Sequence, residues 1–323
     1  MSKACLRETQ AQTYMELVQE GYEIMYLVSD SVSTSRIKLF QQTYPERVVN
    51  LGIAEQNLMG VAAGLANGGF IPITGNATPF LISRSNEQLK VDISYSNSNV
   101  KVNGMHAGFS YGTDGVTHHE VNDISVMRGF PNFEIYAPCD PRECRQITTY
   151  AITERCGPVY MSLNSGLFPD LTPPDHRFVP GEPVQFASGS DITIIALGTA
   201  VHDVLEAQQL WSGRCQADIF ALTSIRPLNS LPLLESIGRT GKVLTVEQHS
   251  THGGAGSLIA ECMAESGTGA KLQRLGIPEG SFTKNWSAPD NKKYFQLDAV
   301  GIEAVVMRLL SDRPLYGHTT NHR

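Results

Sequence analysis

A single carboxylate at the start of a predicted helix has the clearest potential for chemistry in this sequence. Residues 47–67 read RVVNLGIAEQNLMGVAAGLAN, in which a short run rich in Val and Leu ends at Gly52 and Ala, Leu and Met follow. The change of pattern predicts a strand, a turn and a helix with Glu55 in its first turn. Acidic residues often stabilise helix N-termini without any further role. If Glu55 is instead buried against a ligand nitrogen, its carboxyl group could hold or deliver a proton.

The helix that follows Gly52 carries glycine at every fourth position. Gly60, Gly64 and Gly68 therefore share one face, which has almost no side chains. Another backbone can approach such a face closely. The pattern predicts that this helix packs in a tight interface, with Glu55 at its start.

The segment 106–120, HAGFSYGTDGVTHHE, contains three histidines, one aspartate and three glycines within fifteen residues. A zinc site could use His106, Asp114 and His118, but the adjacent His118 and His119 project differently and no fourth ligand is evident. The histidines could also be structural groups that cap turns. A polar site in which imidazoles bind hydroxyl groups or a phosphate, and move protons near neutral pH, fits the composition better.

Elements that would position these groups alternate between short apolar runs and helix-like segments. Such alternation predicts an α/β fold with mostly parallel sheets. A length of 323 residues is sufficient for two domains. We predict a first domain at 1–175, a proline-rich linker at 176–190, a second domain at 191–323, and a frayed tail after Arg313. In the first domain we expect strands at 24–28, 48–51, 70–74, 100–105, 133–136 and 159–163, and helices at 7–19, 80–95, 121–128 and 141–155.

Composition excludes several classes of function. A net charge of −7 and a pI near 5.7 provide no basic surface for nucleic acid. The sequence contains no apolar run long enough to span a membrane and no signal-peptide core, so we expect a cytoplasmic protein. The six cysteines lack a CxxC pair and are interpreted as reduced packing residues.

Taken together, these motifs are similar to the C-terminal half of transketolase, as it occurs when that enzyme is encoded as two separate subunits. The likeness covers nearly the whole chain. GIAEQN at 52–57 resembles the glutamate motif of the family, and HAGFSYGTDGVTHH at 106–119 resembles its substrate-channel loop. The same order continues with FLISRSNEQLK at 80–90, APCDPRECRQ at 137–146, TVEQHSTHGGAGS at 245–257 and RLGIPEGSF at 274–282.

This resemblance implies thiamine diphosphate chemistry, in which a two-carbon ketol unit passes from a ketose to an aldose. Glu55 matches the catalytic glutamate that bonds the aminopyrimidine ring of the cofactor, and Phe80 matches an aromatic residue that stacks on this ring. Asp114 and His118 match residues that contact the hydroxyl groups of the donor sugar. The positions that match ligands of the substrate phosphate are Arg7, Thr34 and His106.

The sequence departs from the family at three positions. Ser83 and Asn86 replace two further aromatics around the cofactor ring, so stacking would contribute less to holding it. Leu163 corresponds to a phosphate-binding arginine, and loss of a charge-assisted contact of that kind costs roughly 1.5 to 3 kcal/mol. We therefore expect an unusual sugar phosphate or a related acidic sugar in place of the standard substrates.

The family signature for the magnesium and diphosphate site, GDG followed by Asn, is absent from this sequence. The resemblance therefore implies a partner subunit that carries the diphosphate-binding domain and most of the Mg²⁺ ligands. We expect two copies of each chain in a heterotetramer, with active sites between chains. The face formed by Gly60, Gly64 and Gly68 is the candidate contact.

Three alternatives have the same overall plan. The beta subunit of a 2-oxo acid dehydrogenase has the same kind of glutamate, but the His-rich loop suits polyhydroxylated sugars better. A 1-deoxyxylulose 5-phosphate synthase-like enzyme shares the EQ and DGxTH motifs but is normally a single chain. A non-catalytic regulatory or assembly subunit would have no need to retain Glu55, Asp114 and His118 together.

Overall fold

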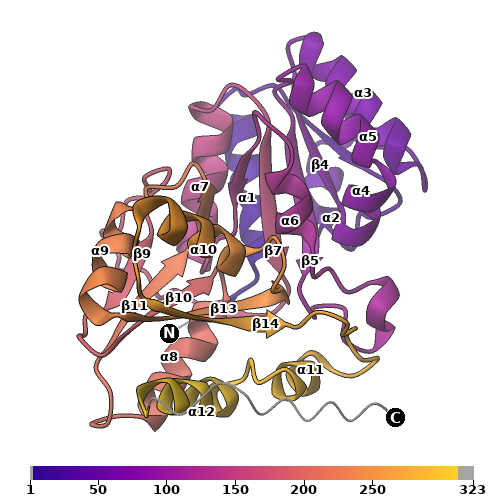
Figure 1. Cartoon of the computed structure of the whole chain (residues 1–323). Coiled ribbons are helices and arrows are strands. Elements are labelled where there is room, and N and C mark those ends of the chain that lie inside the picture. Colours follow the sequence, from indigo (N-terminus) through magenta and orange to yellow (C-terminus); the bar gives the residue numbers. More distant parts are fainter. Residues whose placement is uncertain (1–2, 312–323) are drawn as a thin grey trace.

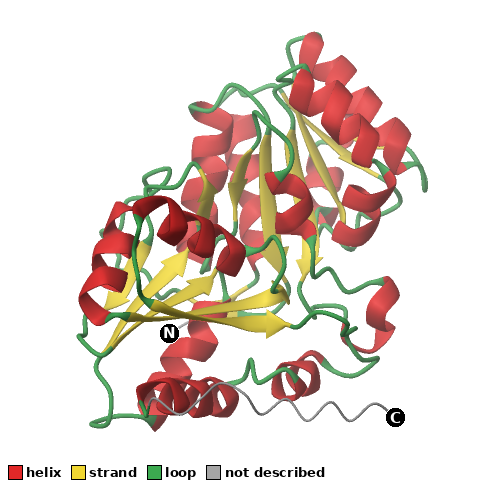
Figure 2. Ribbon diagram, in the orientation of Figure 1, coloured by secondary structure: helices red, strands yellow, loops and turns green. Residues whose placement is uncertain are grey.

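The computed structural model describes residues 3–311, which form two α/β domains (Figures 1 and 2). In Figure 1 the first domain, coloured indigo to magenta, stands above the second, coloured orange to yellow. Both sheets are mostly parallel, as the alternating pattern predicts. The tail after Arg313, predicted to fray, lies outside the described residues.

Seven strands form the sheet of the first domain, in the order β12, β6, β7, β5, β4, β2, β3. All neighbouring pairs are parallel except β12 with β6. The carboxyl ends of the parallel strands therefore meet along one edge, where ligand sites of such sheets lie. The strands are β2 (Ile24–Val28), β3 (Val48–Asn50), β4 (Ile71–Ala77), β5 (Lys101–Ala107), β6 (Glu134–Tyr136), β7 (Val159–Asn164) and β12 (Ser224–Arg226).

Helices cover both faces of this sheet and bury its apolar side chains. On one face, Tyr14 and Phe40 pack with Tyr26 of the sheet, and on the other Leu58 and Leu81 join a second cluster. The first face is covered by α1 (Leu6–Gln19), α2 (Lys38–Thr43) and α7 (Pro141–Thr153). The second is covered by α3 (Glu55–Asn67), α4 (Thr78–Arg84), α5 (Asn86–Gln88), the π-helix η2 (Leu89–Tyr95) and α6 (Asp123–Arg128).

The second domain has a five-stranded sheet in the order β14, β13, β10, β11, β9, in which only β9 is antiparallel. The buried Trp211 lies in the core between this sheet and helices α8 and α12. The strands are β9 (Val184–Ala187), β10 (Ile192–Leu197), β11 (Ala217–Leu222), β13 (Lys242–Ser250) and β14 (Lys271–Ile277). The helices are α8 (Ala200–Leu210), α9 (Leu231–Thr240), α10 (Ala255–Ser266), α11 (Ala288–Tyr294) and α12 (Ala299–Leu310).

Two local predictions differ from the structure. The helix expected at 80–95 is divided into α4, α5 and η2, with a break at Ser85, whose hydroxyl donates to the backbone carbonyl of Leu81. Side chains of this type compete with the helical backbone for hydrogen bonds. The range expected to be a linker, 176–190, contains β9, so its last part belongs to the second sheet. Its prolines obscure a strand that occupies the sheet edge, where proline-rich flanks are tolerated.

No helix within residues 3–311 is long and apolar enough to cross a membrane. All six cysteines are free, and three of them are buried, in agreement with their interpretation as packing residues.

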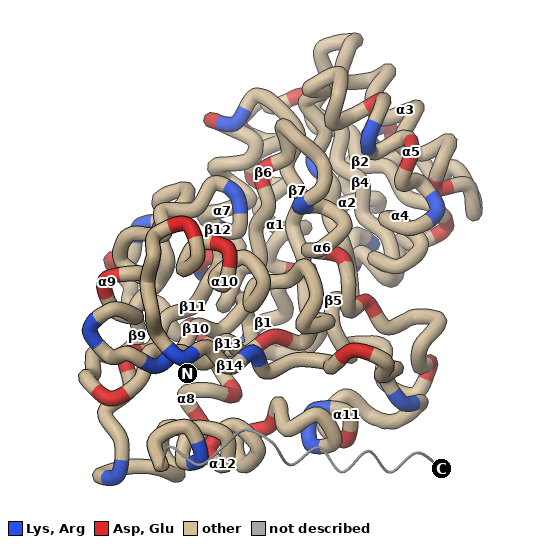
Figure 3. The backbone as a smooth tube through the Cα atoms, in the orientation of Figure 1, with Lys and Arg blue, Asp and Glu red and all other residues tan. Residues whose placement is uncertain are grey.

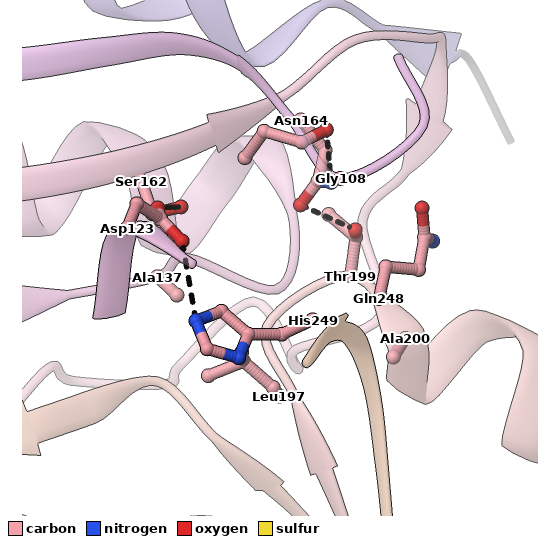
Figure 4. Close-up of a pocket in the computed structure, with 11 residues that line it drawn as sticks. Gly108, Asp123, Ala137, Ser162, Asn164, Leu197, Thr199, Ala200, Gln248 and His249 are labelled. Atoms are coloured by element: carbon pink, nitrogen blue, oxygen red, sulfur yellow. Dashed lines mark hydrogen bonds and ion pairs between the residues drawn. The ribbon is translucent and has the colours of Figure 1, made fainter. Parts of the chain in front are cut away.

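A polar cluster lies where the two domains meet. Asp123 accepts hydrogen bonds from the hydroxyl groups of Tyr160 and Ser162, at 2.8 and 2.5 Å, and its other oxygen lies 3.9 Å from Nε2 of His249 in the second domain. Figure 4 shows His249 pointing toward Asp123 across a small cavity of about 20 Å³, which is enough for one water molecule. Glu120 is buried nearby.

The buried Glu120 carboxyl group should make stability depend on pH. Burial and the neighbouring Asp123 carboxylate raise the pKa of Glu120 from 4.5 to about 8. The folded state therefore binds more protons than the unfolded state between these values. The stabilising contribution is complete below pH 4.5 and is lost as pH rises through about 8.

Glu120→Gln replaces the protonated form with a neutral amide that can still accept from the backbone N–H of Asn122. We expect the free energy of unfolding of this variant to exceed that of wild type by about 1–3 kcal/mol near pH 8, and the two to converge near pH 5. Urea unfolding at several pH values measures the difference. Glu23→Gln, at an exposed ion pair, is the control. A gain that is larger near pH 5 than near pH 8 would contradict the assignment.

Candidate functional site

Most of the residues singled out in the sequence follow the carboxyl ends of parallel strands in the first sheet. Thr34 comes after β2, Glu55 after β3, Phe80 after β4, and His106 lies at the end of β5. Arg7, at the start of α1, joins them. The topology of the sheet, rather than closeness in sequence, brings these groups to one edge.

Glu55 is the first residue of α3, and its side chain is only 4% exposed. Nη1 of Arg84 donates to both carboxylate oxygens, at 3.1 and 3.0 Å. The guanidinium carbon of Arg84 lies 4.4 Å from the centre of the Phe80 ring. Glu55 and Phe80 are thus joined through one planar cation, and the burial that a functional Glu55 requires is present.

His118 connects Phe80 with the loop that follows β5. Its ring lies edge-on to Phe80, with centroids 5.1 Å apart, and 5.2 Å from Tyr111. Nδ1 of His118 is 2.9 Å from the Thr117 hydroxyl. Asp114 is exposed in the 3-10 helix η3 (Gly112–Thr117) of the same loop. These positions leave polar groups free to meet a ligand beside Phe80.

Gly115 anchors this loop to the second domain. Its φ of +71° is unfavourable for other residues, and a Cβ atom there would overlap the side-chain amide of Asn285. The loop therefore lies directly against residues of the second domain, which restricts the positions of Asp114 and His118. This close approach explains one of the glycines that make the segment unusual in sequence.

His106 adopts a left-handed backbone conformation with φ of +65°, and its ring stacks on Tyr111 at 4.2 Å. Its Nε2 lies 2.5 Å from Nη1 of Arg7, and its Nδ1 lies 2.7 Å from the Ser165 hydroxyl. Arginine can only donate, so Nε2 is the acceptor and Nδ1 carries the proton. Burial and the adjacent Arg7 lower the pKa of His106 to about 4, which keeps the ring neutral.

Arg7 is buried and also donates to the carbonyl oxygen of Thr34, at 2.7 Å. Its Nε has no hydrogen-bond partner among the described residues. Unpaired buried donors are uncommon and favour an anionic ligand. Thr34 contributes its backbone to this cluster, and burial raises the pKa of the neighbouring Tyr111, whose hydroxyl hydrogen-bonds the Thr34 side chain.

Other predicted positions lie apart from this chain of contacts. Asn86 and Ser83 are exposed beside it. His119 points elsewhere, with Nε2 on the carbonyl of Gly112. Leu163 is fully buried in a hydrophobic cluster and does not face the site, whereas Ser165, two residues further on, bonds His106. The departure from the family pattern at Leu163 thus concerns a core position, and Ser165 is the residue at this strand end that reaches the site.

Sequence reasoning missed Arg84, Tyr111 and Ser165. Arg84 lies four residues after Phe80 on a predicted helix, a spacing at which side chains can meet, and this is the available signal. Nothing in the sequence distinguishes Tyr111 or Ser165 from ordinary loop residues. Within the described residues, no group of three His, Cys, Asp or Glu side chains is placed to hold a metal ion, so the structure offers no support for zinc.

Comparison with known proteins places this fold and site in a family. The transketolase pyrimidine-binding domain matches residues 2–170, and the transketolase C-terminal domain matches residues 183–302. One of the two subunits of an apulose-4-phosphate transketolase, from Actinobacillus succinogenes, is 41% identical over 94% of this chain and 98% of its own. A 6-deoxy-6-sulfo-D-fructose transketolase subunit from Clostridium sp. is 33% identical over 84% of each chain.

A solved structure described as a split-gene transketolase in an inactive β4 tetramer has a similar fold. It is 34% identical, covers 95% of this chain and 98% of its own, and superposes with a TM-score of 0.85. Both domains, their order and nearly the whole length therefore agree with subunits of divided transketolases. This chain belongs to the transketolase family.

Proposed function

We propose that this chain is one subunit of a thiamine-diphosphate-dependent transketolase built from two kinds of chain. The observation that carries the proposal is the buried Glu55 carboxylate linked to the Phe80 ring by a planar N–H donor. An aminopyrimidine ring has the same two properties, because it is flat and bears nitrogens that can pair with a carboxyl group. These residues therefore fit the pyrimidine end of the cofactor.

In the proposed reaction, bound thiamine diphosphate supplies the carbon nucleophile and electron sink for moving a two-carbon ketol unit between sugars. Glu55 holds the aminopyrimidine ring and shares a proton with its ring nitrogen, while Phe80 supports the face of the ring. Asp114 and His118 bind donor hydroxyl groups, and His118 moves protons at the reacting oxygen.

The cluster of Arg7, His106 and Ser165 is the proposed site for the far end of the sugar. The cationic Arg7 has a buried donor to spare, so it suits an anionic group such as a phosphate or sulfonate. The neutral His106 adds no second positive charge. One relative is named for apulose 4-phosphate and another for 6-deoxy-6-sulfo-D-fructose. We propose that this chain likewise acts on an acidic sugar other than the standard pentose and heptulose phosphates.

The proposal includes a partner that binds the diphosphate end of the cofactor and Mg²⁺, in an assembly of two copies of each chain. Two kinds of relative support it, since the similar transketolase chains are named as subunits and the similar β4 tetramer is described as inactive. We also propose that Asn86 borders the cofactor ring, because it follows Phe80 and Arg84 around the same helix turn.

Co-expression with the product of the neighbouring reading frame tests this function. We expect a stable complex that binds thiamine diphosphate with Mg²⁺ and transfers a ketol unit to an aldose phosphate. A screen of acidic ketose donors, with xylulose 5-phosphate as reference, should find a donor with clearly higher kcat/KM than the reference. Equal turnover of both would contradict the substrate proposal. Pyruvate as the preferred donor would favour the synthase alternative, and a lipoyl-bearing partner would favour the dehydrogenase.

A further inference from the structure

Arg84 makes the two contacts that the proposed function assigns to the cofactor ring. Its Nη1 lies 3.1 and 3.0 Å from the oxygens of Glu55, and its guanidinium carbon lies 4.4 Å from the centre of the Phe80 ring. A guanidinium group is planar and stacks on aromatic faces at such distances. The same flat cation therefore takes up both the carboxylate and the aromatic surface.

The location of Arg84 allows it to leave. It is the last residue of α4, and its side chain is 47% exposed, whereas the Glu55 side chain is 4% exposed. The contacts that hold its guanidinium group are those to Glu55 and Phe80. A rotation about side-chain torsions would carry the guanidinium into solvent without moving the backbone, while Glu55 would stay buried.

We propose that Arg84 acts as a built-in stand-in for the aminopyrimidine ring. In the chain without cofactor it pairs with the buried Glu55 and covers Phe80. An arriving ring must take both contacts from the guanidinium, so the two compete for one place. This inference rests on the proposed function, and it makes Arg84 a positioning residue that keeps Glu55 paired and in place until the cofactor binds.

The competition predicts opposite effects of one substitution on two measured quantities. Removal of Arg84 abolishes the competitor, so the assembled complex should bind thiamine diphosphate more tightly. The same change leaves a buried carboxylate without its cation in the free chain, which should destabilise that chain. A residue that merely supported the cofactor would instead weaken binding when removed.

The test uses the complex reconstituted from this chain and its partner, titrated with thiamine diphosphate at saturating Mg²⁺ and followed by calorimetry. For Arg84→Ala we expect the Kd of the cofactor to fall about 3- to 10-fold, and for Arg84→Lys, which keeps the charge but loses the plane, a smaller fall. Arg47→Ala is the matched control, because Arg47 also pairs with a glutamate, Glu23, away from the site. An unchanged or higher Kd for Arg84→Ala overturns the inference.

Thermal unfolding of the free chain supplies the second measurement. Arg84→Ala should lower the unfolding midpoint, and Glu55→Gln in the same chain should restore much of the loss, because the unpaired buried charge is then removed. No loss in the single variant would also overturn the inference. If the wild-type complex binds no thiamine diphosphate, the proposed function itself fails. Binding by wild type with no gain in the variant refutes only the role of Arg84.

Discussion

Glu55→Gln is expected to lower kcat/KM for ketol transfer by about 10²- to 10⁴-fold in the assembled complex, the range typical for loss of a positioned proton-transfer group. The amide has nearly the shape of the carboxylate and can accept from Arg84 through its oxygen. It cannot share a proton with a ring nitrogen as a carboxyl group can. The loss should therefore appear in chemistry rather than in folding.

The control for this variant is Glu23→Gln, which alters an exposed carboxylate in the ion pair with Arg47. It should leave kcat/KM unchanged. Circular dichroism and the unfolding midpoint of the Glu55 variant should remain close to those of wild type. Wild-type turnover by Glu55→Gln would remove Glu55 from the catalytic machinery and favour a non-catalytic role for the chain.

Much of the site could be predicted because its residues occupy places that the pattern of strands determines. Phe80 and His106 lie at the ends of apolar runs, and in a parallel sheet these ends converge. Glu55 could be placed at a helix start because the sequence changes period just before it. The contacts that link these residues were not predictable, since they depend on rotamers and on loops that cross from one strand end to another.

Arg84 and Leu163 illustrate the two kinds of error. In the sequence Arg84 resembles an ordinary charged residue on a helix, and only burial of Glu55 beneath it makes their pairing significant. Counting along a motif places Leu163 at the site, yet alternation along β7 turns its side chain into the core, while the chain beyond the strand brings Ser165 to His106. A shift of one or two positions at a strand end changes which side chain faces a ligand.

Gly64→Leu is expected to prevent assembly with the partner while the chain itself stays folded. Gly60 and Gly64 are exposed on α3, and a Cβ atom built at Gly64 meets no atom within 4 Å. The exposed Ile53, Val91 and Tyr95 lie on or beside this helix and its neighbour η2. Figure 3 shows α3 almost free of charged residues, a property of the buried centre of protein interfaces.

Leucine is a better helix former than glycine, so the free Gly64→Leu chain should be more stable by roughly 0.5 to 1 kcal/mol. In the complex, its side chain would fill the space that a partner backbone needs, and each active site that lies between chains would be lost with the contact. Analytical ultracentrifugation of the mixed subunits, together with ketol-transfer activity, measures both effects. We expect free subunits and activity at least about 100-fold below wild type, a loss of about 2.7 kcal/mol or more.

Gly238→Leu is the matched control for this change. Gly238 is likewise an exposed glycine inside a helix, α9 of the second domain, and a Cβ atom added to it would have no neighbour within 4 Å. It should gain the same helix stability and assemble normally. If both variants assemble, the glycine face of α3 is solvent-exposed in the enzyme, and the contact must lie elsewhere. If both fail, bulk on any helix disturbs the chain, and only loss confined to Gly64→Leu supports a partner seated against α3, next to Glu55.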